Sequence, residues 1–267
     1  KEEKAILAQV SRCYKNVVLV INTGGLMDLA FVEEFDNIRS ILQYVQAGQE
    51  GGNAFADVVS GDVTPSGKMT DTWALDYMDY PNAAYFSHKS GDVYREEYRE
   101  GIYVGYRYFD TFGKEVSYPF GHGLSYTTFS FDVVSSGIDG DKCEMKVSVK
   151  NTGSRAGKES VQLYVKAPAG GLEKPAKELK AFAKTKLLQP GESEVVTLSW
   201  NLMDMASFNE KSSSWELAKG TYQWMAAASS ADVRCTVSQK VSKSQKVKAH
   251  DAMKPAYKIA ELDMVKR

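Results

Sequence analysis

The sequence predicts two domains of different class: part of an α/β sandwich, with a mostly parallel sheet and flanking helices, followed by an all-β immunoglobulin or fibronectin III-like sandwich. Three observations predict them. The length of 267 residues exceeds one typical domain. Residues 1–123 alternate apolar runs, glycine loops and short helical patterns, as α/β layers do. Residues 124–245 hold short alternating segments between turns, and residues 246–267 are expected to be a tail or linker.

The α/β part is expected to begin with a helix over residues 2–14, where apolar side chains recur every three to four positions. Residues 17–21 are apolar throughout, which is typical of a strand inside a parallel sheet covered on both faces. A second strand is expected over residues 41–45 and a short helix over residues 53–60. The helix side chains that we expect to face the sheet are Ala54, Phe55, Val58 and Val59.

Four segments of the second half alternate polar and apolar residues, as strands with one buried face do. They are residues 146–150, 161–166, 194–200 and 221–225. Turn signals separate them, for example Asn-Thr-Gly at 151–153 and Gln-Pro-Gly-Glu at 189–192. Because the Cys…Trp…Cys spacing of antibody domains is absent, the fibronectin III relatives fit better.

Composition excludes several classes of partner. The net charge is −1, and the basic residues after residue 123 are scattered lysines without interleaved aromatics, so we expect no nucleic-acid partner. No run of about 18 apolar residues occurs, so we expect no membrane partner. The first residues carry no secretory signal pattern. Because residue 1 is lysine rather than methionine, we expect the natural start to lie further upstream.

The cysteines and histidines give no sign of a metal site or a cofactor. The three cysteines are few, odd in number and far apart, and no Asn-x-Ser/Thr site occurs. This pattern favours free thiols and a reducing, cytoplasmic setting. None of the three histidines, which are His88, His122 and His250, has a metal-ligand or catalytic-triad neighbour in sequence. We therefore expect surface or turn positions for them and no cofactor.

The loop at residues 48–52 joins the carboxyl end of a predicted strand to the start of a helix, the edge of an α/β sheet that faces a ligand crevice. Gln49 and Glu50 are therefore the candidate binding residues. We favour a tight turn with Glu50 as a charge at the helix N-terminus, and the alternative is a contact to substrate or to a neighbouring domain. Residues 61–68 do not form a nucleotide-binding loop, because Asp62 and Met69 stand where that motif needs glycine and a hydroxyl. They are expected to turn into a sheet-edge strand.

The stretch from Tyr94 to Tyr126 is rich in aromatic residues, which suit either sugar stacking or packing. Because the rings are too many to line one site, we favour packing between the two domains, with Arg107 and Asp110 as a hydrogen-bonded pair. Three carboxylates lie beside this stretch without a second acidic group of defined role, namely Glu96, Glu97 and Glu100.

Four glycine-punctuated runs carry a family resemblance. They occupy residues 47–54, 60–68, 100–110 and 118–126, in this order. Together with residues 17–25, 157–165, 177–182 and 187–193, they resemble glycoside hydrolase family 3, the β-glucosidase family. The resemblance covers about residues 1–245. It implies the second half of that family's α/β sandwich domain and its fibronectin III-like domain.

The resemblance also implies a function. In that family a (β/α)8 barrel supplies an Asp nucleophile, and a Ser-Gly-Glu-Gly-like loop supplies the general-acid Glu. Retaining glycosidases hold these two carboxyls about 5–5.5 Å apart. Neither motif occurs here, so no residue of this chain is expected to be catalytic. We expect part of a retaining, exo-acting β-glycosidase, which hydrolyses terminal β-D-glucosyl residues of β-linked glucosides or oligosaccharides, with the barrel as partner domain.

Two questions stay open at this point. The barrel either precedes this segment or follows it, and the apolar residues after 245 favour the permuted order. The alternative function is a non-catalytic module that binds carbohydrate or protein. A homo-oligomer is compatible with either.

Overall fold

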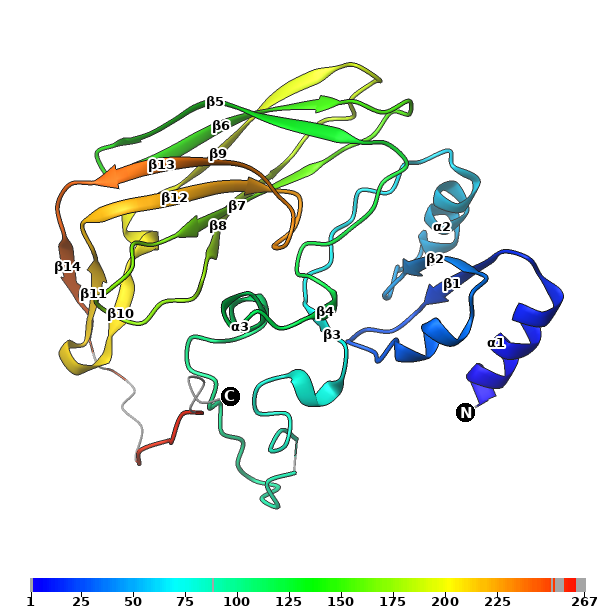
Figure 1. Cartoon of the computed structure of the whole chain (residues 1–267), viewed down its shortest axis with the longest axis horizontal. Coiled ribbons are helices and arrows are strands. Elements are labelled where there is room, and N and C mark those ends of the chain that lie inside the picture. Colours follow the sequence, from blue (N-terminus) through cyan, green and yellow to red (C-terminus); the bar gives the residue numbers. More distant parts are fainter. Residues whose placement is uncertain (1, 88, 251, 253–256, 263–267) are drawn as a thin grey trace.

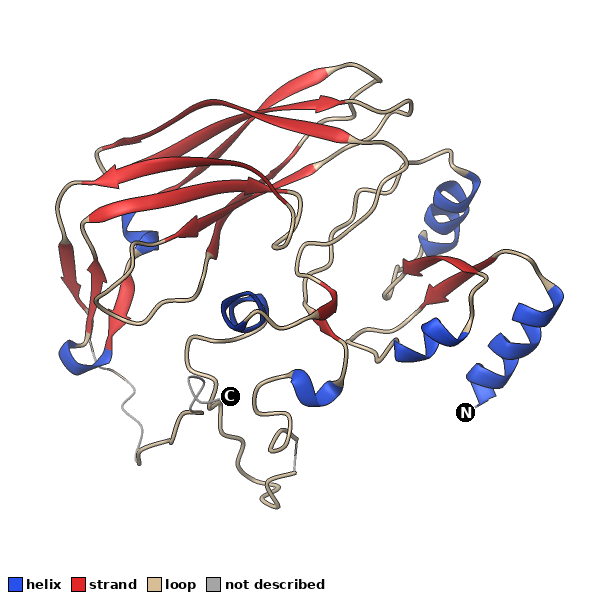
Figure 2. Cartoon of the chain, viewed as in Figure 1, coloured by secondary structure: helices blue, strands red, loops and turns tan. Residues whose placement is uncertain are grey.

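The structure is a computed structural model that describes residues 2–87, 89–250, 252 and 257–262. Figure 1 shows a mixed helix-and-strand part at the N-terminal side and a large β-sandwich beside it. Figure 2 shows that long strands dominate the sandwich, whereas most helices lie in the first part. The predicted fold classes are therefore confirmed. His88 and tail residues 251, 253–256 and 263–267 lie outside the described residues.

The first part contains two strands that run in the same direction. In chain order its elements are α1 (Glu2–Cys13), β1 (Val17–Ile21), the 3-10 turn η1 (Ala30–Glu34), β2 (Ile38–Gln43) and α2 (Gly51–Ser60). β1 and β2 pair in parallel, and Ile21 lies opposite Gln43. α2 ends at Gly61, whose left-handed φ of 86° favours glycine. No helix of the described residues is long and apolar enough to cross a membrane.

One face of β1 is covered within this chain and the other is exposed. Val17 and Ile21 are buried, whereas Val18 and Val20 are 50% and 38% exposed. Among the described residues β1 pairs with β2 alone. The parallel pairing that the apolar run predicts is present, but the part of the chain that the structure describes covers only one of the two faces.

The second strand and the helix after it begin earlier than predicted. β2 starts at Ile38 and ends at Gln43, because Val45 has a φ of 54°, which does not continue a strand. α2 includes Gly51 at its start. Within α2, Phe55 is half-buried and packs edge to face on Tyr44 at 5.6 Å. Ala54 and Val59 are exposed rather than turned to the sheet.

Short elements connect the first part to the sandwich: β3 (Trp73–Ala74), η2 (Tyr77–Asp79), α3 (Tyr106–Phe112) and β4 (Val116–Tyr118). β3 and β4 pair antiparallel. The strand expected after the turn at 65–67 is the short β3, which begins only at Trp73. Met69 exchanges backbone hydrogen bonds with His122 and Gly121, at 2.8 Å each.

The sandwich consists of two antiparallel sheets. One has the order β5-β6-β9 and the other β13-β12-β7-β8. The strands are β5 (Phe129–Asp139), β6 (Lys142–Asn151), β7 (Ser160–Lys166), β8 (Glu178–Lys184), β9 (Ser193–Asn201), β12 (Gly220–Ala227) and β13 (Val233–Val241). Trp200 and Trp224 meet edge to face between the sheets at 4.4 Å. All four predicted strand segments are confirmed.

A third, smaller sheet lies at the far end of the sandwich (Figure 1), in the order β10-β11-β14. The elements there are η3 (Leu202–Met205), β10 (Ser207–Asn209), η4 (Glu210–Ser212), β11 (Ser214–Leu217) and β14 (Gln245–Lys248). Strand structure thus continues past residue 245, because β14 pairs with β11.

Candidate functional site

The loop with Gln49 and Glu50 lies at the carboxyl end of β2, as the sequence predicts. Glu50 occupies the N-cap of α2, and its Oε2 accepts a hydrogen bond of 2.7 Å from the Asn53 side chain. Gly51 is needed there, because a Cβ would lie 2.5 Å from the Tyr44 hydroxyl oxygen. Gln49 and Glu50 are both exposed.

A second loop meets this one at the same edge of the sheet. The Gln43 side chain donates to the Thr23 carbonyl at 3.4 Å, which ties the end of β2 to the loop after β1. Gln46 lies against Gly24. The two loops form a polar, carboxylate-poor rim of the kind that contacts ligands in open α/β sheets. Whether Gln49 and Glu50 bind substrate stays a prediction.

The rim offers no metal site among the described residues, and the carboxylates at 96, 97 and 100 belong to another loop. No group of three or more His, Cys, Asp or Glu side chains in them could hold a metal ion. Glu96 is exposed and accepts from the Ser87 amide at 3.3 Å, while the Glu97 carbonyl accepts from Asn82 at 3.1 Å. Glu100 bonds Tyr103 through its backbone.

Two open hollows of about 520 Å³ each lie away from this rim. One is between β8 and β9 on the sandwich. The other is between α1 and η1 and includes Glu34 and Asp36. Glu34 forms an exposed ion pair of 2.6 Å with Lys4, and Arg12 and Lys15 also line this hollow. Its two carboxylates thus lie among basic side chains, and one of them is already paired.

The aromatic stretch packs the two parts together only in part: Tyr103, Tyr108 and Phe109 form a cluster within the first part, whereas Tyr106 and Phe120 contact the sandwich as predicted. Tyr106 of α3 stacks on Phe120 at 4.9 Å and meets Tyr164 of β7 edge to face at 5.7 Å. The Tyr106 hydroxyl also accepts from the Leu179 amide at 2.8 Å. Tyr94 and Tyr98 take no part in this packing, since they are 97% and 80% exposed.

The predicted pair of Arg107 and Asp110 is wrong. Both lie on α3, but each turns to a residue at the start of β8. Arg107 Nη1 lies 3.7 Å from Glu178 Oε1, and Asp110 Oδ2 lies 3.1 Å from Lys177 Nζ. Burial raises the pKa of Asp110, and the neighbouring Lys177 partly opposes that shift. These opposite charges attach α3 to the sandwich.

Tyr103 offers a pH-dependent test of this packing. Burial, together with a hydrogen bond of 2.7 Å to Glu173 Oε1, raises the pKa of Tyr103 from 10.0 to about 12. Its stabilising effect is therefore complete below pH 10 and is lost as the pH rises towards 12. The unfolding free energy of the wild type should fall between pH 10 and about 12. We expect a smaller fall in Tyr103→Phe, measured by urea titration at each pH. The exposed Tyr94→Phe is the control, and equal pH profiles for wild type and Tyr103→Phe would contradict the assignment.

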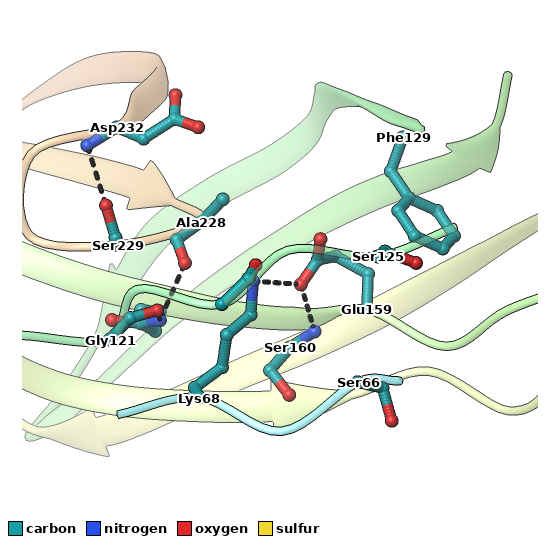
Figure 3. A network of polar contacts seen from close by, with 12 residues as sticks. Ser66, Lys68, Gly121, Ser125, Phe129, Glu159, Ser160, Ala228, Ser229 and Asp232 are labelled. Carbon is teal, nitrogen blue, oxygen red and sulfur yellow. Dashed lines mark hydrogen bonds and ion pairs between the residues drawn. The ribbon is translucent and has the colours of Figure 1, made fainter. Parts of the chain in front are cut away.

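A polar joint connects the first part to the sandwich (Figure 3). We use "joint" for residues 66–69 and 120–123 with the sandwich residues that they contact. Lys68 Nζ lies 2.9 Å from Glu159 Oε1 and 3.2 Å from the Gly123 carbonyl oxygen. The two side chains of the ion pair are 15% and 10% exposed, so water screens them little.

The other half of the joint is built on Gln162 of β7. Its Nε2 donates to the carbonyls of Gly121 and Ala228, at 3.1 and 2.8 Å. The Ser230 amide donates to the Phe120 carbonyl at 2.8 Å. A Cβ on Gly121 would collide with Gln162, so the backbone of the first part lies directly on the sandwich.

Comparison with known proteins agrees with these features. Residues 1–126 match the model described as "Glycosyl hydrolase family 3 C-terminal domain", and residues 159–230 match "Fibronectin type III-like domain". The chain belongs to glycoside hydrolase family 3. It carries that family's C-terminal domain and its fibronectin III-like domain, and the predicted recognition is confirmed.

Several relatives in this family are β-glucosidases. "Beta-glucosidase A" of Butyrivibrio fibrisolvens is 42% identical over 254 residues, covering 87% of this chain and 30% of the relative. "Thermostable beta-glucosidase B" of Acetivibrio thermocellus is 35% identical over 252 residues, covering 93% and 32%. The structure of β-glucosidase 3B from Thermotoga neapolitana with α-D-glucose superposes with a TM-score of 0.86 at 40% identity, covering 93% of this chain and 35% of that one. This chain thus spans about a third of the length of these family 3 relatives.

Proposed function

We propose that this family 3 chain is part of a retaining, exo-acting β-glycosidase that hydrolyses terminal β-D-glucosyl residues. The observation that carries the proposal is the similarity of nearly the whole chain, in sequence and fold, to relatives named β-glucosidases. Neither sequence motif that carries the family's two catalytic carboxyls occurs in this chain. In this proposal the nucleophile and the general acid therefore belong to polypeptide outside this chain.

In this proposal the α/β part forms one wall of the active-site cleft. The rim at the carboxyl ends of β1 and β2 is the edge where ligands approach such sheets. The sandwich braces the wall through the joint, whose Lys68–Glu159 ion pair is largely shielded from solvent. Bracing matters because catalysis depends on holding the reacting groups in a defined geometry.

Apolar side chains that are exposed on the first part support the proposal that a further domain covers them. Val18 and Val20 of β1 are exposed, as are Ile6 at 62% and Tyr14 at 64% near α1. A parallel strand with one bare apolar face is unusual in a completed sheet. We propose that the rest of the α/β domain and a (β/α)8 barrel cover these surfaces. A homo-oligomer and a reducing, cytoplasmic setting stay predictions, the latter supported by three free thiols.

The direct test is hydrolysis of nitrophenyl β-glucoside by the purified chain and by the full-length gene product. We expect turnover by the full-length protein and only the buffer rate with the chain alone. Turnover by the chain alone would place catalytic groups within it. An inactive full-length protein that binds glucosides would instead support the alternative of a non-catalytic module.

The role of Gln49 can be separated from the helix role of Glu50 in the full-length protein. If the rim contacts substrate, Gln49→Ala should raise KM about threefold, equivalent to one modest hydrogen bond, at unchanged Tm. Glu50→Gln should lower Tm slightly, because it removes a negative charge from the N-terminus of α2. An unchanged KM for Gln49→Ala would assign the loop to turn formation alone.

Exposed apolar side chains on the third sheet favour the alternative function, a non-catalytic binding module. Phe208, Trp215 and Val247 face each other across β10, β11 and β14 and are 43%, 47% and 51% exposed. If the sandwich only braces the wall, calorimetric titration with cello-oligosaccharides should give no heat. Heat that disappears in Trp215→Ala would support a binding module.

A further inference from the structure

The chain returns to its first part after completing the sandwich. β14 ends at Lys248, yet residues 257–262, here called the strap, lie against residues 95–103. The Arg99 Nε donates to the Ala260 carbonyl at 2.7 Å, and the Leu262 amide donates to the Arg99 carbonyl at 2.9 Å. Figure 1 shows this red segment below the sandwich, close to the loops of the first part.

Side chains reinforce this backbone contact. Leu262 packs against the aromatic cluster that includes Tyr103, Tyr108 and Phe109. The Arg95 guanidinium lies 4.7 Å from the ring centre of Tyr257, a cation–π distance. The strap is therefore attached at both of its ends and in its middle.

Arg99 is the centre of the arrangement. Its side chain and its carbonyl bond two positions of the strap, and its guanidinium lies 5.4 Å from the ring centre of Tyr85. One residue thus joins three segments that are far apart in sequence. Gly101 completes the fit: its φ is 56°, and Glu261 Oε2 lies 3.1 Å from where a Cβ would stand.

The segment of residues 95–103 is anchored at its far end by the buried Tyr103, which bonds Glu173, but its earlier residues have few other supports. Between η2 and α3 the described residues contain no helix or strand. Tyr94 and Tyr98 are 97% and 80% exposed, so burial of these rings holds nothing in place. The bond from Asn82 to the Glu97 carbonyl, at 3.1 Å, is a further tie. Segments with few buried contacts open locally at low free-energy cost.

We propose that the strap holds residues 95–103, and with them the carboxylates of that segment, in a fixed position on the first part of the chain. Arg99 makes the central contacts, and we call this arrangement the latch. The sandwich end of the chain is then connected to the wall twice, through the joint and through the strap. The strap acts on the position of a surface segment rather than on the sandwich core. This inference does not depend on the proposed activity.

Hydrogen exchange followed by mass spectrometry on the full chain tests the latch. Leu262→Asp removes the apolar anchor, and Arg99→Ala removes the side-chain bond. Each is expected to speed exchange in peptides covering 95–103 about five- to tenfold, as for the loss of one or two local contacts. Peptides from β6 should be unchanged.

Lys258→Asp is the matched control, since Lys258 is an exposed strap residue. It should leave exchange of residues 95–103 at the wild-type rate. Trypsin cleavage after Arg95 gives a second readout and should accelerate only in Leu262→Asp and Arg99→Ala. Wild-type exchange and cleavage in both variants, or equal acceleration in the control, would overturn the proposal.

Discussion

Replacing Lys68 by methionine is expected to lower the free energy of unfolding by about 2–3 kcal/mol, because it leaves the Glu159 carboxylate largely buried without a counter-charge. Glu159 Oε1 lies 2.9 Å from Lys68 Nζ and otherwise accepts from the Ser160 amide at 2.7 Å. The Gly123 carbonyl also loses its partner. Methionine keeps the apolar stem of lysine, so the loss reports the charge and its hydrogen bonds rather than the packing.

Two further variants make this expectation specific. Lys68→Met combined with Glu159→Gln should recover most of the loss, since no buried charge is then left unpaired. Lys186→Met breaks the ion pair with Glu192 at 2.8 Å, where Lys186 is 59% exposed, and should change nothing measurable. Urea unfolding is best followed by both circular dichroism and tryptophan fluorescence, since a chain of two parts need not unfold in one step. A double variant no more stable than Lys68→Met would contradict the role of the pair.

Local patterns in the sequence predict much of the fold, because they depend on neighbouring residues. The apolar spacing of the first helix and the five-residue apolar run predict α1 and β1 nearly to the residue. β2 is placed less well: Arg39 and Ser40 are exposed within it, so its start carries no apolar signal. Its end depends on the left-handed Val45, which no rule for valine predicts.

Partners far apart in sequence could not be predicted in this way. The i, i+3 spacing suggests a pair between Arg107 and Asp110. Instead, Arg107 pairs with Glu178, the first residue of β8, and Asp110 pairs with Lys177, the residue before that strand. No pattern of neighbouring residues in the sequence indicates the Lys68–Glu159 ion pair or the contact between the strap and residues 95–103. Gly123 is the available signal of the joint, since close backbone approach is a reason for glycine where no turn requires it; Gly121 is already explained by its φ of 78° in the turn at 119–122. The loop with Gln49 and Glu50 is found by its motif, and its binding role stays a prediction.

Glycine at position 123 is expected to be nearly as important as the buried ion pair. A Cβ there would collide with the backbone carbonyl oxygen of Gly67 and would also lie 3.1 Å from the Lys68 side chain. Backbone cannot rotate away as a flexible side chain can. Gly123→Ala must therefore separate the two loops of the joint, and we expect it to cost about 2 kcal/mol, within the range for overpacked sites.

Gly67→Ala is the control in the same joint, because a Cβ at position 67 meets nothing within 4 Å. With no steric conflict, alanine should be neutral or slightly stabilising through the lower entropy of the unfolded chain. The two variants carry the same chemical change on opposite sides of one contact, so a difference in Tm between them measures the close approach itself. Hydrogen exchange should rise at the amides of Met69 and Gly121, whose bonds of 2.8 Å hold the loops together, in Gly123→Ala alone. Equal Tm values for both variants would mean that the loops have room to separate, and that the wall is not held rigidly on the sandwich.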